Sequence, residues 1–558
     1  MTLRRLVTLL RRDATTSRAG AADAAAVVHA ASVKAGHDAD VRLSNHLLNS
    51  YGKAGSLASA RRAFDGMPRR SLVAWSALIS GHVQAGRPDL ALALFARMDL
   101  DARPNEYVYG SVLRSCGALR ALAVGVQVHA DAVKNGFLAV SFVANSVISM
   151  YMKCRCFEDG YAAFNSLMEP NVVSYNAAIS GLAESSQPQR GLEVFKLMKL
   201  QGLHPDRFSY AGVLGICIAL ENRCTGELLH GEAIMVGLDI AVFVGNVILD
   251  MYSKIGTITD AEKVFRCMEE KDVITWNTHI AAHSRHGAHV GALMVFKDMV
   301  GIAHDRNVLP DDYTLSSALA ACAELSLIRH GEQVHGHLIR SRKDPDVAVG
   351  NAIIDMYAKC GKMVLAARVF DRLPSQILLS WNTMISGFGK QGHANEAIKM
   401  FDRMKEAGIV PDSVTFTALI AACNHAGWVN QGMELFNRMR ETYHISPRIE
   451  HVSCLADLLG RAGRLQEAEE YFRSSELRDD PVALGSLLSA SRVHGDAGTG
   501  ERAARRLLAL GPSTSSPYVL LSQLYASDKR WDNVAEARGM LKNRVPKKDA
   551  AWSVIQGI

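Results

Sequence analysis

The sequence lacks several features that would assign it to a common class of protein. Its ten cysteines contain no C-x-x-C pair, so neither a zinc site nor a disulfide framework is indicated. The longest apolar run, around residues 210–220, is too short to span a bilayer, and no membrane partner is predicted. No phosphate-binding loop or nucleophile motif occurs. We therefore predict no enzymatic activity, no metal and no cofactor.

The sequence also has only a small excess of positive over negative charge. The net charge is +6 over 558 residues, and residues 1–20 contribute +4 of it through five arginines and one aspartate. The remaining charge of about +2 does not indicate nucleic-acid binding by a large positive field. Any RNA binding must depend on a local groove and on contacts to bases.

The first twenty residues, MTLRRLVTLLRRDATTSRAG, are rich in arginine and hydroxyl groups and nearly free of acids. This composition is typical of an organellar transit peptide. A frayed, arginine-rich first helix is the alternative. The many arginines and leucines favour the mitochondrion over the chloroplast.

Residues 242–277 predict two helices and the start of a third. In VGNVILDMYSK the apolar residues follow an i, i+1, i+4, i+5 spacing, which forms one helical stripe. Gly256 is expected to end this helix, as a residue that tolerates a positive φ would. Thr257 and Asp260 are expected to cap the next helix. Neither helix can bury its stripe alone, so this hairpin needs neighbours.

The same pattern recurs with a long period of about 100 residues. Equivalent places hold an aromatic residue at Trp75, Tyr175, Trp276 and Trp381, and a histidine at His29, His129, His230 and His335. Each period divides into three helical hairpins of 31 to 35 residues, as in residues 172–206, 207–241 and 242–272. This repetition predicts an all-α fold, a right-handed α-solenoid superhelix of helical hairpins.

The strings VSYNAAISGLAESSQPQRGLEVFKLMKLQGLHPD, GNAIIDMYAKCGKMVLAARVFDRLP and GEQVHGHLIRS carry a resemblance to a known family. The chain resembles the PLS class of plant organellar pentatricopeptide repeat (PPR) proteins, E subgroup, over roughly residues 20–545. The resemblance implies a transit peptide (1–20), a partial long repeat (20–40), an array of standard, long and short repeats (41–480), a tetratricopeptide-like E region (481–545) and a tail (546–558). No DYW deaminase domain is present in the sequence.

One repeat, residues 273–311, is stretched to 39 residues. The extra residues lie in VGIAHDRNVLPD, where we expect a lengthened loop.

The resemblance implies two RNA-reading residues in each repeat: the fifth residue of the first helix and the last residue of the repeat. The implied pairs are Asn45 with Ser71, Ser76 with Asn105, Asn145 with Asn171, Asn176 with Asp206, Asn246 with Asp272, Asn277 with Asp311, Asn351 with Ile377, and Asn382 with Asp412. An Asn early in a helix is often only a cap. Capping would not require a matching polar residue some 30 positions later, in repeat after repeat.

The second residue of most repeats is apolar or aromatic, so it could sandwich a base. The candidates are Val73, Phe142, Val173, Phe243, Ile274 and Leu379, with Tyr107, Phe208, Tyr313 and Val414 at the same place. Arg42 and Ala348 depart from this pattern. Part of the stripe could equally be core, which the sequence does not separate.

The code that the resemblance implies assigns Asn with Asp to U, Asn with Asn or Ser to a pyrimidine, and Ser with Asn to A. Long repeats carry poor pairs at Gly110 with Val140 and at Ala211 with Ala241, and are expected to act as spacers. Ser316 with Asp346 is polar and is left unassigned. The predicted site reads 5′-Y-A-n-Y-U-n-U-U-n-Y-U-3′.

Two features imitate reactive sites. His230 and His330 each begin an H-x-E string like that of zinc deaminases, but the P-C-x-x-C string that completes such a zinc site is missing. Four cysteines, Cys116, Cys217, Cys322 and Cys423, recur at one place in the repeat, which favours a small packing residue over a reactive thiol.

The function predicted from these features is sequence-specific binding of single-stranded organellar RNA. The resemblance implies a site-recognition factor for C-to-U editing. Its partners would be a DYW-type deaminase supplied in trans and multiple-site organellar editing factors. The alternatives are a splicing or transcript-stability factor and a helical-repeat scaffold that binds only proteins.

Overall fold

The structure, a computed structural model, describes residues 18–36, 40–67, 69–98, 103–239, 241–306, 308–340, 346–473, 480–510 and 515–544. Every regular element among these residues is a helix. The chain divides into two compact units, Met1–Ala282 and His283–Ile558, which are described separately. Residues 1–17 of the expected transit peptide and the expected tail, 546–558, lie outside the described residues.

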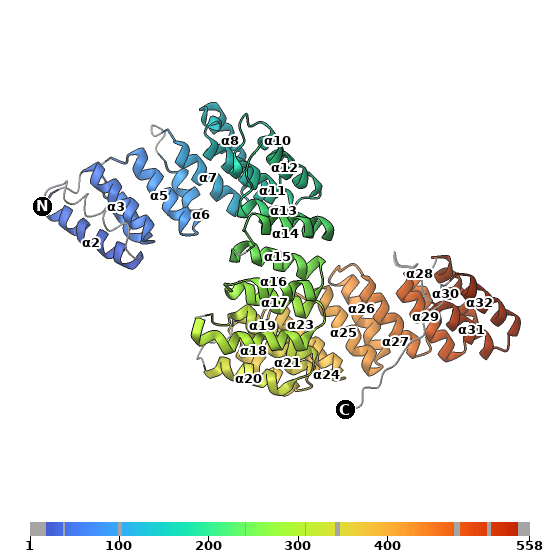
Figure 1. Ribbon diagram of the computed structural model, residues 1–558. Helices are drawn as coiled ribbons and strands as arrows, with labels where there is room; N and C mark the ends of the chain where they lie inside the picture. The colour runs from blue at the N-terminus through green and yellow to red at the C-terminus, as the bar shows by residue number, and fades with distance from the viewer. Residues whose placement is uncertain are drawn as a thin grey trace. The chain divides into compact units, whose positions relative to one another are not determined.

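The first unit is a series of helical hairpins (Figure 1). Its helices are α2 (Arg18–Lys34), α3 (Val41–Lys53), α4 (Leu57–Asp65), α5 (Leu72–Gln84), α6 (Pro88–Phe95), α7 (Glu106–Leu119), α8 (Leu122–Lys134), the 3-10 helix η2 (Phe137–Ala139), α9 (Ser141–Lys153), α10 (Phe157–Asn165), α11 (Val172–Leu182), α12 (Gln189–Leu200), α13 (Arg207–Ala219), α14 (Arg223–Met235), α15 (Val242–Ile255) and α16 (Ile258–Cys267). Helix α17 (Val273–Arg285) begins in the first unit and ends in the second.

The second unit continues the same alternation. Its helices are α18 (His289–Arg306), α19 (Asp312–Glu324), α20 (Ile328–Arg340), α21 (Val347–Lys359), α22 (Met363–Arg372), α23 (Leu378–Lys390), α24 (Ala394–Glu406), α25 (Ser413–Ala426), α26 (Val429–Glu441), α27 (Ile449–Arg461), α28 (Leu465–Arg473), α29 (Pro481–His494), α30 (Ala497–Ala509), α31 (Ser516–Ser527) and α32 (Trp531–Arg544). The last four helices are the two hairpins expected for the E region.

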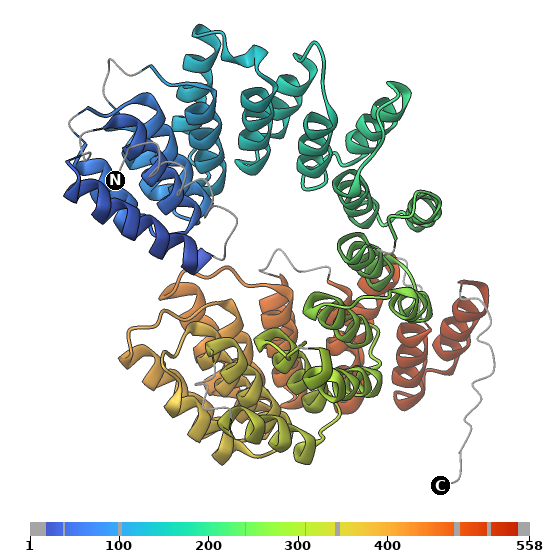
Figure 2. The same cartoon turned by 60° about the vertical axis from the view of Figure 1, so that its left-hand side comes forward.

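Within each unit the first helix of a hairpin packs against its own second helix and against the next first helix (Figure 2). The first helices therefore form continuous rows, from α3 to α15 by odd numbers in one unit and from α19 to α31 in the other. Each amphipathic helix buries its apolar stripe against these neighbours, as the sequence of one hairpin requires. The predicted all-α solenoid of helical hairpins is confirmed.

The recurrent residues of the sequence form recurrent packing contacts. The aromatic residue of each standard repeat meets a Phe of the preceding short repeat edge to face, with ring centroids 4.7 Å apart for Trp75 and Phe64 and 5.0 Å apart for Tyr175 and Phe164. The four recurrent cysteines are fully buried, and burial raises the pKa of each thiol to about 11. The expectation that these cysteines are packing residues is confirmed.

Gly256 ends α15 as the sequence predicts, but not in the positive-φ conformation that glycine tolerates. It has φ −106° and ψ −153°, because the chain leaves the helix in an extended conformation that leads directly into the capping box of Thr257 and Asp260. Glycines do adopt positive φ at the equivalent turns, Gly55 (77°) and Gly361 (75°).

The stretched repeat 273–311 does not contain a long loop. Its extra residues extend the second helix, α18, through Arg306, so that this helix has 18 residues. The segment VGIAHDR contains no proline, and Pro310 is the first residue after it that cannot continue a helix. The extra residues therefore join the helix that precedes them.

Candidate nucleic-acid interface

The fifth residue and the last residue of repeat 172–206 are joined by a hydrogen bond. Asn176 Nδ2, on α11, donates to Asp206 Oδ1 at 2.9 Å, and Asp206 is the N-cap of the next first helix, α13. The Ser209 hydroxyl donates to Asn176 Oδ1 at 2.6 Å, and the Ser209 backbone N–H donates to Asp206 Oδ1 at 2.9 Å. We call this arrangement of fifth-residue Asn, N-cap residue and hydroxyl three residues later the clamp.

The clamp recurs with the same geometry in three other repeats. The fifth-residue amide donates to the cap oxygen in the pairs Asn145–Asn171 (3.2 Å), Asn246–Asp272 (3.1 Å) and Asn382–Asp412 (3.1 Å). The hydroxyl donates to the Asn oxygen from Ser174 (2.6 Å), Thr275 (2.7 Å) and Thr415 (2.7 Å). A direct hydrogen bond across the repeat boundary is thus the physical reason that a polar fifth residue is matched by a polar last residue.

The first two reading pairs form looser arrangements. Ser71 caps α5 and donates from its hydroxyl to Asn45 Oδ1 at 3.0 Å. Asn105 caps α7, but no hydrogen bond joins it to Ser76 in the described part of the chain. Both repeats lack the third partner, because Ala74 and Val108 occupy the place of the clamp hydroxyl.

The two remaining pairs differ from these: one has its two residues in different units, and the other has an apolar last residue. Asn277 is buried in the first unit, whereas Asp311 caps α19 in the second, so each is described only within its own unit. In the other pair, the last residue that matches Asn351 is Ile377, the N-cap of α23, and its side chain has no polar group.

The apolar second residues lie on the surface and are not core, which settles the alternative that the sequence left open. The six sandwich candidates have exposed side chains, from 39% at Phe142 to 62% at Ile274. Each stands in the first turn of a first helix, one turn before the fifth residue, so it shares that residue's face. The first helices thus present a row of alternating clamps and exposed apolar side chains.

In long repeat 106–140 an aromatic ring occupies the space that the fifth-residue side chain takes in a clamp. A Cβ added at Gly110 would lie 2.2 Å from the Phe142 ring, so the next repeat's ring occupies the space of a fifth-residue side chain. The ring is accompanied by Tyr107 (centroids 6.1 Å apart) and by the Arg114 guanidinium (5.3 Å from the ring centroid). A similar pair, Phe208 and Phe243, has centroids 5.4 Å apart at the next long repeat.

A surface cleft of about 530 Å³ shows how these positions combine. It lies over α3, α5 and α7, and its lining includes the fifth residues Asn45 and Ser76 and the second residues Arg42, Val73 and Tyr107. Each fifth residue is therefore accompanied in the cleft by second residues of its own and of the following repeat. This is the arrangement needed to stack a planar base and contact its edge.

The clamp aspartates are acceptors at neutral pH. Burial raises the pKa of Asp206, but hydrogen bonds from the Ser209 backbone and the Asn176 amide outweigh it, so the pKa lies below its ordinary value. The pKa values of Asp272 and Asp412 are lowered by the same competition. A carboxylate can accept the N3–H of uracil, whereas the Asn171 amide can both donate and accept and so suits either pyrimidine.

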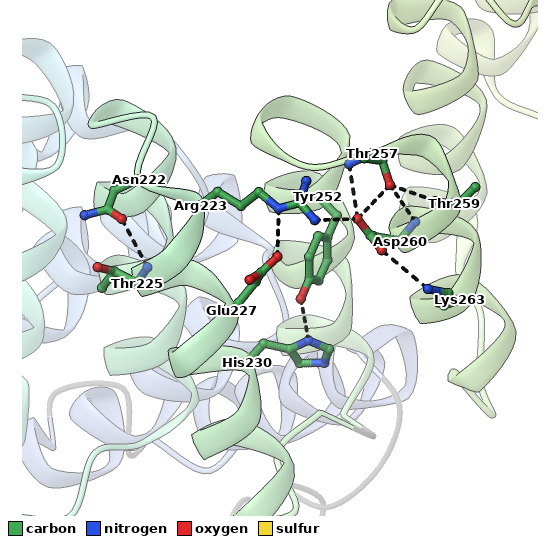
Figure 3. A network of polar contacts seen from close by, with 10 residues as sticks. All are labelled: Asn222, Arg223, Thr225, Glu227, His230, Tyr252, Thr257, Thr259, Asp260 and Lys263. Atoms are coloured by element: carbon green, nitrogen blue, oxygen red, sulfur yellow. Dashed lines mark hydrogen bonds and ion pairs between the residues drawn. The ribbon is translucent and has the colours of Figure 1, made fainter.

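The recurrent histidines hold long repeats to short ones. His230 Nδ1, on α14, lies 3.0 Å from the Tyr252 hydroxyl on α15 (Figure 3), and His29, His129 and His335 contact Tyr51, Tyr151 and Tyr357 in the same way. Burial lowers the pKa of all four histidines, which keeps them neutral at pH 7. The glutamate of the H-x-E string, Glu232, forms an ion pair with Lys199 at 2.9 Å. These contacts account for the string without a metal.

Sequence reasoning missed the clamp hydroxyl and the tyrosine partners of the histidines. A signal for the hydroxyl exists, because Ser or Thr stands three residues after the caps Asn171, Asp206 and Asp412, as a capping box requires. Within the described residues no three His, Cys, Asp or Glu side chains are grouped to hold a metal ion. None of the described helices combines the length and apolar character needed to cross a membrane.

Sequence profiles match much of the chain. The PPR repeat family profile matches residues 170–218 and 378–425, and the single PPR repeat profile matches 43–72, 73–101, 246–273, 274–302, 351–376 and 414–442. The E motif profile matches residues 494–556.

Curated relatives are similar along nearly the whole chain. Pentatricopeptide repeat-containing protein At1g11290, chloroplastic, of Arabidopsis thaliana is 32% identical over 530 residues, which cover 95% of this chain and 65% of the relative. Putative pentatricopeptide repeat-containing protein At3g15130 of the same organism is 32% identical over 557 residues, covering 99% of this chain and 80% of the relative. The chain spans between 53% and 65% of the length of At1g11290 and of three other curated relatives from Arabidopsis thaliana.

Solved structures share the fold. The crystal structure of PPR10 from maize superposes with a TM-score of 0.58 at 18% identity, covering 97% of this chain and 89% of that one. PPR10 in complex with an 18-nt psaJ RNA element gives a TM-score of 0.56 at 17% identity, covering 96% and 92%.

Proposed function

The chain belongs to the pentatricopeptide repeat family, PLS class with an E motif, and we propose that it binds a specific single-stranded RNA through the row of clamps on its first helices. The observation that carries the proposal is the recurrence of one clamp geometry in four repeats, beside exposed apolar side chains. A repeated unit on a solenoid meets successive nucleotides of an extended strand, one base for each repeat.

The chemistry of each clamp supplies the selection. In the clamp of Asn176, one amide hydrogen is used on Asp206, and one remains for a base edge. The Asp206 carboxylate then favours the N3–H of uracil over the N3 acceptor of cytosine. The exposed second residues contribute stacking of about 1–3 kcal/mol per base where they are aromatic, independent of sequence.

Binding of synthetic RNAs tests this proposal. The RNA 5′-YANYUNUUNYU-3′ is expected to bind at least about tenfold more tightly than a scrambled RNA, a difference of roughly 1.4 kcal/mol. Asn176→Ala should weaken the intended RNA and leave the scrambled one unchanged. Asn165→Ala, on the exposed face of second helix α10, is the matched control and should change neither. Equal binding of both RNAs would favour the protein-binding scaffold.

A swap of one pair tests the reading more sharply than a loss. The double variant Asn176→Ser with Asp206→Asn reproduces the Ser76 and Asn105 pair. It should prefer A over U at the nucleotide opposite this repeat and keep its preferences at all others. A uniform loss of affinity would instead indicate damage to the fold, which circular dichroism would reveal.

We further propose that the bound RNA is an organellar transcript and that the protein marks a C for editing to U. The E motif match and the PLS order of repeats support this role. A DYW-type deaminase, joined by multiple-site editing factors, would act in trans. The mitochondrion is the proposed site, although relatives are named chloroplastic.

Editing can be measured directly in a plant line without the protein. Sequencing of mitochondrial and plastid transcripts should show loss of editing at a C close to a match to the predicted RNA. Changed introns or transcript ends with all editing intact would favour a splicing or stability factor.

A further inference from the structure

Repeat 347–377 keeps the reading amide but has lost its partner. Asn351 stands 26 residues before the N-cap of the next first helix, the same spacing as Asn246 to Asp272 and Asn145 to Asn171. That N-cap is Ile377, which makes no side-chain cap and is 45% exposed. The hydroxyl place of the clamp is still filled, by Ser380.

The remaining clamp groups are buried without hydrogen bonds. Asn351 is 5% exposed, and in the described chain neither its Nδ2 nor its Oδ1 has a partner. The Ser380 hydroxyl is fully buried and likewise unpartnered. Burial of such groups costs free energy, because their hydrogen bonds to water are lost and are not replaced by bonds within the protein.

The neighbouring repeat shows that burial alone is not the cause. Asn382 is 7% exposed, yet its amide nitrogen donates to Asp412 and its oxygen accepts from Thr415. Both repeats lie in the same unit and share one register. The difference between them is the residue at the cap, isoleucine against aspartate.

The repeat before it is also incomplete. Ser316, the fifth residue of long repeat 312–346, has a buried and unpartnered hydroxyl, and Asp346 uses its carboxylate to accept from the Val347 backbone N–H at 2.8 Å. The second residue of repeat 347–377 is Ala348, where most other repeats carry a larger apolar side chain. Two consecutive repeats thus lack the clamp, and the second of them also lacks a large apolar side chain at its second position.

We infer that repeat 347–377 does not discriminate among bases, although it carries the reading asparagine. An enclosed amide that no cap orients cannot present a defined donor and acceptor to a base edge. This inference rests on the proposed RNA binding. It changes one position of the site that the sequence predicts from Y to n, which gives 5′-Y-A-n-Y-U-n-U-U-n-n-U-3′ with two adjacent unread nucleotides.

Binding by the full chain of RNAs that differ only at the nucleotide opposite repeat 347–377 tests this inference. The four bases there should bind within about twofold of one another. At the next nucleotide, opposite Asn382 and Asp412, replacement of U should weaken binding by about tenfold. Equal discrimination at both nucleotides would overturn the inference.

Ile377→Asp should restore the missing partner. Its carboxylate would accept from the Asn351 amide and the Ser380 backbone, so a preference for U of about fivefold to tenfold should appear at this nucleotide. Ile377→Ala, which shortens the side chain without adding an acceptor, is the control and should create no preference. Absence of any gain in Ile377→Asp would also overturn the inference.

A measurement without RNA separates this inference from the proposed function. Ile377→Asp should raise the melting temperature by roughly 2 °C, because it caps α23 and satisfies buried groups. A melting temperature below that of Ile377→Ala would show that a carboxylate at position 377 does not satisfy the buried Asn351 and Ser380 groups. If no RNA is bound by sequence at any repeat while this rise occurs, the proposed function fails and the structural basis of the inference stands.

Discussion

Repeats 106–140 and 172–206 lie in the same unit, have the same hairpin and differ at the surface that would meet RNA. In repeat 172–206 the fifth residue, Asn176, is held by the cap Asp206. In repeat 106–140 the fifth residue is Gly110, which lies under the Phe142 ring, and the following helix has Val140 at its N-cap with no side-chain cap. In these two repeats the fifth residue and its cap are either both polar and bonded or both apolar.

The difference also shows what the long repeats contribute. Each gives up the clamp but carries the histidine that contacts a tyrosine hydroxyl of the following short repeat, as His129 contacts Tyr151 at 2.9 Å. The long repeat therefore contacts the following short repeat through this pair, and its role as a spacer between reading repeats stays a prediction. Its capping residue is free to vary because it supports no amide.

The largest effect is expected from truncating the residues at the two N-cap positions, of which only Asp206 makes a side-chain cap. Asp206→Ala should lower the free energy of unfolding by about 2 kcal/mol, because it removes a helix cap and leaves the Asn176 amide without its acceptor. Val140→Ala, at the equivalent position, should cost less than about 0.5 kcal/mol. Urea unfolding followed by circular dichroism measures both. Similar losses in the two variants would break the comparison.

A smaller effect is expected where the ring covers the glycine. Gly110→Ala and Gly215→Ala both lie in first helices of long repeats and gain the same helix propensity, but only Gly110 has a ring in the way. Gly110→Ala should be less stable than Gly215→Ala by about 1 kcal/mol, the value of displacing the half-exposed ring from its aromatic partner. Equal melting temperatures would mean that the ring does not occupy this place in solution.

The smallest effect concerns pH and the histidines of the long repeats. The folded pKa of His230 is lowered by burial, so the unfolded chain takes up the proton first as the pH falls. The stability that this histidine contributes is present above its ordinary pKa of 6.5 and is lost progressively as the pH falls below that value. His230→Gln should therefore reduce the loss of stability between about pH 6.5 and pH 5 by a few tenths of a kcal/mol. Urea unfolding at several pH values checks it, and an unchanged slope would contradict it.

Much of the fold could be predicted from the sequence, because period and hydrophobic spacing are local. The hairpins, the capping box at Thr257 and Asp260, and the burial of Cys116 and its equivalents all followed from residues within one repeat. The predictions were incomplete or wrong where one local sequence feature is compatible with two backbone conformations. A glycine after a helix can adopt positive φ or extended backbone, as at Gly256, and extra residues can lengthen a loop or a helix, as in α18.

The candidate site was predicted less completely, because it depends on contacts between repeats. The pairing of Asn176 with Asp206 was implied by a resemblance, but its physical basis, one hydrogen bond and a shared Ser209, required coordinates. The orphaned state of Asn351 was equally hidden. The sequence shows that Asn351 is matched by Ile377, but only the structure shows that both polar atoms of the Asn351 side chain are buried without a hydrogen-bond partner.

The central claim is that clamps read bases and long repeats do not. It is tested most directly by replacing, one at a time, the nucleotides opposite repeats 172–206 and 207–241 and measuring the dissociation constant of each RNA. Replacing U with G opposite repeat 172–206 should weaken binding by about tenfold, and any replacement opposite repeat 207–241 should change it by less than about twofold. Equal losses at the two nucleotides, or none at either, would contradict the account.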